Sequence, residues 1–243
     1  MSLLQATDIS KAFGGIQALN ACSISVEKGS ITGLIGPNGS GKTTLFNVIT
    51  GYERPDTGSV TFDGANISRL GPDRIFDLGI GRTFQLTRIF PRLTVTENMH
   101  VAIKRKGVAS LLGRWSASSE NDRALNLLEF VGLTHLKDEP AGSLSYGQRK
   151  LLELAFILIA EPSMILLDEP AGGINPTLIG QLGDRIRQLN SQGVTFLIVE
   201  HNMEFVMGLC SRVMVMHRGA KLAEGTPEAV RANPAVLEAY LGD

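Results

Sequence analysis

The sequence is poor in cysteine, in excess charge of one sign and in long apolar runs. Two cysteines among 243 residues, Cys22 and Cys210, cannot build a disulfide framework, so a reducing compartment is expected. The 23 basic and 24 acidic residues nearly balance, and nothing in them indicates a nucleic-acid-binding face or an acidic tail. We therefore expect no nucleic-acid partner.

Apolar runs such as residues 154–160 and 164–167 are far shorter than the roughly 20 residues that span a bilayer. The first residues, MSLLQATDISKAF, lack a basic region followed by an apolar run, so no secretion signal is expected. These absences predict a soluble chain. If it works at a membrane, another chain must recruit it.

Short strand and helix patterns alternate along the chain, without low-complexity segments or a repeat of fixed period. Compact apolar runs bounded by turn signals predict strands buried on both faces, at residues 31–35, 164–167 and 194–199. Hairpins are predicted where turn residues follow apolar runs, at residues 60–64 and 213–223. The pattern indicates an α/β core of one large domain or two closely packed subdomains.

The middle of the chain, about residues 86–142, is more helical than either flank. Residues 104–121 mix Gly, Ser and charge and are interpreted as a loop between helical segments. Residues 149–160 predict a buried helix that ends at Glu161-Pro162. Together they predict a helical subdomain inserted at approximately residues 86–160 of a single domain, 1–243.

The segment GPNGSGKT is a complete phosphate-loop motif between a predicted strand and a predicted helix. Its glycines let consecutive backbone N–H groups face phosphate oxygens, at the positive end of the helix dipole. Lys42 is expected to bind the β- and γ-phosphates of ATP and the Thr43 hydroxyl to ligate Mg²⁺. A chance glycine-rich turn is the disfavoured alternative. The predicted nucleotide-binding residues are Gly36, Pro37, Asn38, Gly39, Ser40, Gly41, Lys42, Thr43 and Thr44.

Asp168 and Glu169 emerge together at the end of the predicted strand 164–167. Ligands of open α/β sheets bind at such strand ends. Adjacent buried acids are costly unless a cation or the surroundings of a phosphate compensate. We expect Asp168 to hold Mg²⁺ through its water shell and Glu169 to orient and deprotonate the attacking water. The phosphate loop disfavours the alternative of a solvated acidic turn.

A third motif, LSYGQ at residues 144–148, precedes the predicted helix 149–160. A serine before a helix is usually only an N-cap. Here its position relative to Asp168 resembles the signature of the ABC ATPase family, which has glycine in place of Tyr146. The motif would lie at an anion-binding helix N-terminus. The resemblance implies that ATP is also bound by Ser145, Gly147 and Gln148.

The same resemblance covers nearly the whole chain and implies roles for isolated residues. Phe13 is similar to the aromatic residue that stacks on adenine. Gln85, in GRTFQ, resembles the glutamine that reaches Mg²⁺ and the attacking water. His201, after the strand 194–199 and Glu200, resembles the histidine that contacts the γ-phosphate. Without the resemblance, all three would be interpreted as core or surface residues, as are His100, His135 and His217.

The implied fold is an α/β phosphate-loop NTPase core of the RecA-like, ABC type, with an antiparallel β subdomain and the inserted helices. ABC ATPases work as head-to-tail dimers, so a second ATPase subunit, identical or related, is implied. Each ATP would lie between the phosphate loop of one protomer and residues 145–147 of the other. ATP would hold the halves together and hydrolysis would release them.

Two departures from the common family pattern occur together. Tyr146 replaces a small residue, and Asn175 stands where many relatives carry aspartate, in a loop that communicates between the two ATP sites. With LSYGQ, EPAGGINP, GRTFQLTRIF and the C-terminal EGTPEAVRANPAVLEAYLG, the chain is similar to the LivG type, the importer ATPases for branched-chain amino acids. ATPases for urea or amide import, or for lipopolysaccharide or lipid export, are the alternatives.

The resemblance implies a peripheral subunit at the cytoplasmic face of the plasma membrane, in a bacterial or archaeal cell. Its partners would be transmembrane permease subunits and, indirectly, a periplasmic or extracellular substrate-binding protein. The permease is expected to contact about residues 86–100, where apolar side chains beside Arg88 and Arg92 suit a groove for a short helix, unless they only fill the core: Ile89, Phe90, Leu93 and Val95.

Two other functional classes are disfavoured. An ABC ATPase of DNA repair or translation would need a long coiled-coil insertion or a second cassette, and the sequence has neither. A switch that binds ATP without hydrolysing it would not need both Glu169 and His201.

Overall fold

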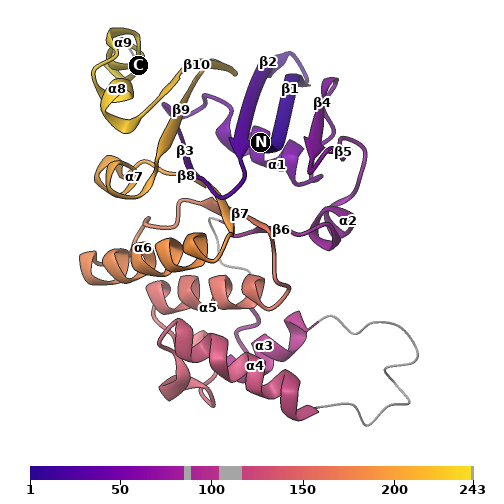
Figure 1. Ribbon diagram of the computed structural model, residues 1–243, viewed down its shortest axis with the longest axis vertical. Coiled ribbons are helices and arrows are strands. Elements are labelled where there is room, and N and C mark those ends of the chain that lie inside the picture. Colours follow the sequence, from indigo (N-terminus) through magenta and orange to yellow (C-terminus); the bar gives the residue numbers. More distant parts are fainter. Residues whose placement is uncertain (85–88, 104–116, 242–243) are drawn as a thin grey trace.

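The structure is a computed structural model that describes residues 1–84, 89–103 and 117–241 (Figure 1). Its larger sheet has the strand order β10-β9-β3-β8-β7-β6, in which all neighbours are parallel except β10 and β9. The strands are β3 (Ile31–Ile35), β6 (Ile80–Arg82), β7 (Met164–Asp168), β8 (Thr195–Val199), β9 (Arg212–His217) and β10 (Ala220–Gly225). The predicted hairpin 213–223 and the three predicted core strands are confirmed.

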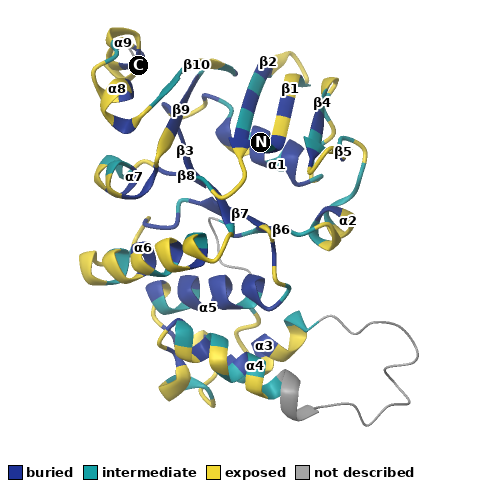
Figure 2. Ribbon diagram, in the orientation of Figure 1, coloured by how far each residue is buried: buried dark blue, intermediate teal, exposed yellow. Residues whose placement is uncertain are grey.

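Side chains of the central strands alternate between two hydrophobic cores, because successive residues of a strand face opposite sides of the sheet. Ile165 and Leu167 face α5 (Tyr146–Leu158), α6 (Pro176–Ser191) and α7 (Met203–Leu209). Leu166 faces the other core, which contains α1 (Lys42–Ile49) and the second sheet. β3, β7 and β8 are therefore buried along their whole length (Figure 2).

The second sheet is antiparallel, in the order β2-β1-β4-β5. Its strands are β1 (Ser2–Phe13), β2 (Ile16–Glu27), β4 (Thr57–Phe62) and β5 (Ala65–Asn66). The predicted hairpin at residues 60–64 is the β4–β5 pair and is confirmed. The residue pattern did not predict the long β1–β2 ribbon, because several register shifts interrupt its alternation of apolar and polar residues.

The elements that the structure describes between β6 and β7 are helical. They are α3 (Val95–Ala102), α4 (Ala117–Phe130), the short 3-10 turns Thr134–Leu136 and Ala141–Ser143, and α5; the helix α2 (Pro72–Asp77) precedes β6. α3, α4 and α5 pack against one another. α5 begins earlier than the predicted residue 149, because Ser145 is its N-cap.

The prediction of a loop over residues 104–121 is wrong at its C-terminal end, where α4 begins at Ala117. The Gly- and Ser-rich composition suggested a loop, but Ala124 and Leu128 of the same helix are fully buried against α3 and α5. Tertiary packing therefore outweighs the weak local propensity. Residues 104–116 of the predicted loop lie outside the described residues.

The chain ends in two short helices, α8 (Pro227–Arg231) and α9 (Pro234–Leu241), which pack beside α7 and β10 (Figure 1). Of all the helices that the structure describes, none combines the length and apolarity needed to cross a bilayer.

Candidate nucleotide-binding and catalytic site

The phosphate loop follows β3 and leads into α1. Gly36, Gly39 and Gly41 have φ angles of 149°, 77° and 101°, which favour glycine. A Cβ atom on Gly36 would lie 2.1 Å from the carbonyl oxygen of Met216 in β9. Both the conformation and this close approach explain why the loop needs glycine at these positions.

Lys42 is buried in the first turn of α1, and its ammonium is held by the loop. Nζ donates hydrogen bonds to the carbonyl oxygens of Gly36 and Pro37, both at 2.8 Å, and to the Ser40 hydroxyl at 3.3 Å. Burial lowers the pKa of Lys42, whereas the nearby carboxylates of Glu169 and Asp168 raise it. The cation and the two acids therefore share one electrostatic environment. Of the neighbouring loop residues, Asn38 and Thr43 are exposed and Thr44 is half-buried.

Asp168 is the last residue of β7 and is 6 % exposed. Its Oδ2 pairs with Arg82 Nη2 at 3.1 Å, and its backbone N–H donates to the Thr83 hydroxyl at 3.2 Å. Arg82 ends the neighbouring strand β6, and Thr83 directly follows it. The contacts fix the carboxylate at the edge of the sheet where the phosphate loop lies.

Glu169 follows in the left-handed backbone region, with a φ of 49°. Its N–H donates to the carbonyl oxygen of Val199 at 2.9 Å, and its own carbonyl accepts a hydrogen bond from the Lys150 ammonium. These contacts hold a conformation that costs free energy in a non-glycine residue. Its Oε1 lies 3.0 Å from His201 Nε2, so the structure brings these two predicted residues together.

Glu200 is a site residue to which the sequence analysis gave no role. It is 2 % exposed, and its carboxylate accepts hydrogen bonds from the backbone N–H groups of Ala171, His201 and Asn202 at 2.5, 2.9 and 3.0 Å. It therefore ties the loop after β7 to the loop after β8. The available signal was an acidic residue directly after an apolar run, Phe196–Val199.

The LSYGQ motif begins α5 with a capping box. The Ser145 hydroxyl accepts from the Gln148 N–H at 3.3 Å, and the Gln148 side chain accepts from the Ser145 N–H at 2.9 Å. Gly147 faces α6, since a Cβ atom there would lie 2.6 Å from Leu178 Cδ1.

The two departures from the family pattern lie near each other. A Cβ atom on Gly173 would lie 3.1 Å from the Tyr146 ring, so the ring packs over the loop that follows β7. Asn175 ends that loop and caps α6 by accepting from the Leu178 N–H at 2.9 Å. Aspartate or asparagine would serve equally as this N-cap.

Two predicted site residues, Phe13 and Gln85, take no part in the contacts described above. Phe13 ends β1 and is 44 % exposed, with the Lys11 ammonium 5.3 Å from its ring centroid. Gln85 lies outside the described residues, as do Leu86 and Arg88 of the predicted permease contact.

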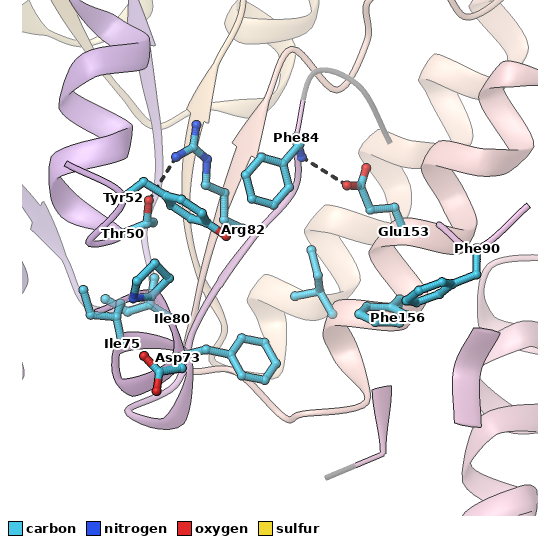
Figure 3. A pocket seen from close by; sticks show the side chains of 13 residues that line it. Thr50, Tyr52, Asp73, Ile75, Ile80, Arg82, Phe84, Phe90, Glu153 and Phe156 are labelled. Carbon is cyan, nitrogen blue, oxygen red and sulfur yellow. Dashed lines mark hydrogen bonds between the residues drawn. The ribbon is translucent and has the colours of Figure 1, made fainter. Parts of the chain in front are cut away.

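Arg82 pairs with Asp168 and also lines a nearby cavity of about 380 Å³ (Figure 3). Its Nη1 donates to Asn47 and Thr50 at 2.7 and 2.9 Å, and its guanidinium lies 5.0 Å from the Phe84 ring centroid. The cavity is lined by Thr50, Tyr52, Pro72, Asp73, Ile75, Phe76, Ile80, Arg82, Phe84, Phe90, Glu153, Phe156 and Ile157. No local pattern indicated these partners of Arg82, because the short strand β6 was not predicted from the sequence.

A family model described as ABC transporter matches residues 19–172, and one described as branched-chain amino acid ATP-binding cassette transporter matches residues 220–243. The chain is 43 % identical to the probable branched-chain amino acid transport ATP-binding protein LivG of Archaeoglobus fulgidus, over 100 % of this chain and 96 % of the relative. It is 39 % identical to BraF of Pseudomonas aeruginosa, a high-affinity branched-chain amino acid transport ATP-binding protein, over 99 % and 98 %. A crystal structure of a nucleotide-free ATP-binding cassette from an ABC transporter superposes with a TM-score of 0.90, at 38 % identity and full coverage of both chains.

Proposed function

Because the chain belongs to the ABC transporter family of ATP-binding cassettes, we propose that it hydrolyses ATP to power import of branched-chain amino acids through separate permease subunits. The observation that carries the ATPase reaction is the Glu169–His201 pair beside Asp168 and Lys42. The amino-acid substrate is supported by the names of the full-length relatives and by the match at residues 220–243.

The fold class expected from the motifs, an ABC-type phosphate-loop ATPase, is confirmed by the family match and the structural likeness. ATP binding and the ATPase class are confirmed with it. Import of urea or amides and export of lipids are not favoured, since the relatives are named for branched-chain amino acid transport.

ATP would be bound by the backbone N–H groups of residues 36–44 and by the Lys42 ammonium, which must turn from the loop carbonyls toward the phosphates. Phe13 would stack on the base, and its exposed ring at the end of β1 leaves a face for it. Mg²⁺ fits the donor set of Thr43 and Asp168, because it prefers hard oxygen ligands and bound water. When bound, the ion would neutralise charge on the phosphates.

Glu169 would take the proton of the attacking water, and His201 would contact the γ-phosphate. Their 3.0 Å contact places both side chains at one point above the end of β7. Gln85 remains a predicted ligand of Mg²⁺ and the attacking water. Ser145, Gly147 and Gln148 would complete the ATP site of a second ATPase subunit, and Ser145 is exposed.

The permease would contact the cavity of Figure 3, between β6, α2 and α5. Phe90, 46 % exposed, lines it, but Val95 is fully buried and belongs to the core rather than to the contact surface. The helices α3, α4 and α5 would form the inserted helical subdomain. Crosslinking from Phe90→Cys to a co-expressed permease tests this surface, and labelling confined to the C-terminal helix α9 would refute it.

The chain would work as a peripheral subunit at the cytoplasmic face of the plasma membrane in a bacterium or archaeon. A substrate-binding protein outside the membrane would act on it only indirectly. This assignment is supported by relatives from an archaeon and a bacterium that are named as transport ATP-binding proteins.

The decisive experiment is Glu169→Gln, which keeps the size of the side chain but cannot accept the water's proton. We expect hydrolysis to slow by about 10²–10⁴-fold while ATP binding persists. Phosphate release and nucleotide affinity should be measured on the same preparation. Hydrolysis at the wild-type rate would refute Glu169 as the base.

A further inference from the structure

A second cavity lies between α7 and the C-terminal helices α8 and α9, in the part of the molecule opposite α3 and α4 (Figure 1). Its volume is about 540 Å³, which is within the size range of small-molecule sites. It is lined by Met203, Glu204, Met207, Val230, Arg231, Val236, Leu237 and Tyr240. None of these residues takes part in the ATP site described above.

The lining combines an aliphatic wall with two opposite charges. Glu204 lies in the first turn of α7, and Arg231 ends α8. Among the described residues, neither side chain has an ion-pair or hydrogen-bond partner. The other lining residues are apolar apart from the Tyr240 hydroxyl, so the cavity suits a small ligand with one positive group, one negative group and an aliphatic body.

We propose that this cavity binds an aliphatic α-amino acid, with its ammonium toward Glu204 and its carboxylate toward Arg231. The side chain of the amino acid would lie among Met203, Val236 and Leu237. The identification of the ligand with the amino acid that the transporter imports rests on the proposed function.

The position of the cavity in the chain supports this ligand. All eight lining residues lie outside residues 19–172, which match the general ABC transporter model. Five of them lie within residues 220–243, which match the model described for branched-chain amino acid cassettes: Val230, Arg231, Val236, Leu237 and Tyr240. The cavity is thus built largely from the segment that distinguishes this transporter type.

The cavity also adjoins the loop after β8 that carries His201. α7 begins at Met203, directly after His201 and Asn202, whose N–H groups are held by Glu200.

An occupant would hold α7 against α9 in the present arrangement, in which His201 pairs with Glu169. Because His201 must contact the γ-phosphate during hydrolysis, we expect the bound amino acid to slow the ATPase. The imported product would then restrain its own uptake.

Titration calorimetry of the whole chain with L-leucine tests binding. Isovalerate, which lacks the ammonium, and isopentylamine, which lacks the carboxylate, should bind at least about tenfold more weakly. Glu204→Gln and Arg231→Gln should each weaken L-leucine binding by a similar factor. The matched controls Glu238→Gln and Arg69→Gln, which change exposed charges outside the cavity, should not. No binding at millimolar L-leucine, or binding unchanged in both cavity variants, would overturn the proposal.

A second measurement separates this inference from the proposed function. L-leucine should lower the ATPase rate of the wild-type chain but not that of Arg231→Gln or of Leu237→Trp, which fills the cavity from an exposed position. If Glu169→Gln abolishes hydrolysis but L-leucine neither binds nor slows the wild type, only this inference fails. If the chain does not hydrolyse ATP, the proposed function fails, and calorimetry still decides the binding site.

Discussion

Glu169 shows how single residues of this site depend on backbone contacts. Its φ of 49° is rare for a side-chain-bearing residue, yet hydrogen bonds from the Lys150 ammonium and to the Val199 carbonyl hold the conformation. Such strain persists only where the surroundings determine it. Here it sets Glu169 3.0 Å from His201, at the point where hydrolysis is proposed.

Lys42→Ala should weaken ATP binding by about one to two orders of magnitude. The change removes a charge-assisted contact worth roughly 1.5–3 kcal/mol to the most highly charged part of the ligand. Calorimetry with ATP measures the effect, and the exposed Lys28→Ala is the matched control. A thermal melt of the variant should show whether it is still folded, because Lys42 also donates hydrogen bonds to the loop carbonyls. Unchanged affinity in a folded variant would refute the phosphate-loop assignment.

Cys22 and Cys210 should resist thiol reagents in the native protein. Both are buried, and burial raises the pKa of Cys22 to about 11 and that of Cys210 to about 12. Since the thiolate is the reactive form, almost none is present near pH 8. Ellman's reagent should react slowly in buffer and rapidly with both thiols after guanidinium unfolding. Two fast-reacting thiols in the native chain would contradict this burial.

Candidate site residues that belong to a short contiguous motif could be predicted from the sequence. Residues whose role depends on contacts with distant parts of the chain could not. Lys42, Asp168 and Glu169 follow from contiguous motifs, and His201 came only with the family resemblance. Glu200 and Arg82 are of this second kind, because their roles depend on contacts from separate strands and loops. One sequence cannot show which backbone N–H group a buried carboxylate will meet.

At the level of secondary structure, uniform burial was easier to predict than irregular pairing. β3, β7 and β8 are short apolar runs because helices and the second sheet cover both of their faces. β1 and β2 were missed because their pairing contains bulges, with Asp8 and Ala21 at positive φ. The start of α4 was missed because its helical state depends on burial of Ala124 and Leu128 further along.

Gly81 lets α5 lie close to β6, which leads to a prediction about stability. A Cβ atom there would lie 2.3 Å from Cγ2 of Ile157, a β-branched side chain with little rotamer freedom. Gly81→Ala should therefore destabilise the protein by about 1–3 kcal/mol, the usual cost of overpacking. Urea unfolding measures the change.

Gly180→Ala is the matched control, because this exposed position in α6 has nothing within 4 Å of its added Cβ atom. It should stabilise the protein by up to about 1 kcal/mol through helix propensity. Equal stability of both variants would contradict the close packing of α5 on β6.

At the scale of the whole molecule, polar contacts link Asp168, the proposed Mg²⁺ ligand, to the proposed permease surface. Arg82 pairs with Asp168 and also lines the cavity of Figure 3, where the Phe84 N–H donates to Glu153 of α5 at 3.1 Å. α5 in turn carries Lys150, which reaches Glu169, and begins at Ser145. Movement of α5 would therefore shift the contact to Glu169 and the proposed permease surface at the same time. It would also shift Ser145, which is proposed to bind the ATP of the second subunit.

The proposed dimer can be tested by a substitution that should affect only the contact between two protomers. Ser145 caps α5 and lies exposed, which suits a residue that completes the site of a second subunit. Ser145→Arg should prevent ATP-dependent dimerisation of Glu169→Gln by placing bulk and charge at the γ-phosphate. Ser145→Gly is the control for the lost N-cap, which costs only a few tenths of a kcal/mol. Size-exclusion chromatography with and without ATP measures both.

Mixing two inactive chains then tests whether Ser145 acts on the partner's ATP. In a dimer of Lys42→Ala and Ser145→Arg, one site combines the intact phosphate loop of the second chain with the intact Ser145 of the first. The other site carries both defects. Each variant alone should hydrolyse ATP slowly, whereas the mixture should recover activity through its one intact site. A mixture no more active than the sum of its parts would show that Ser145 does not complete a site across the dimer, and the head-to-tail arrangement would have to be abandoned.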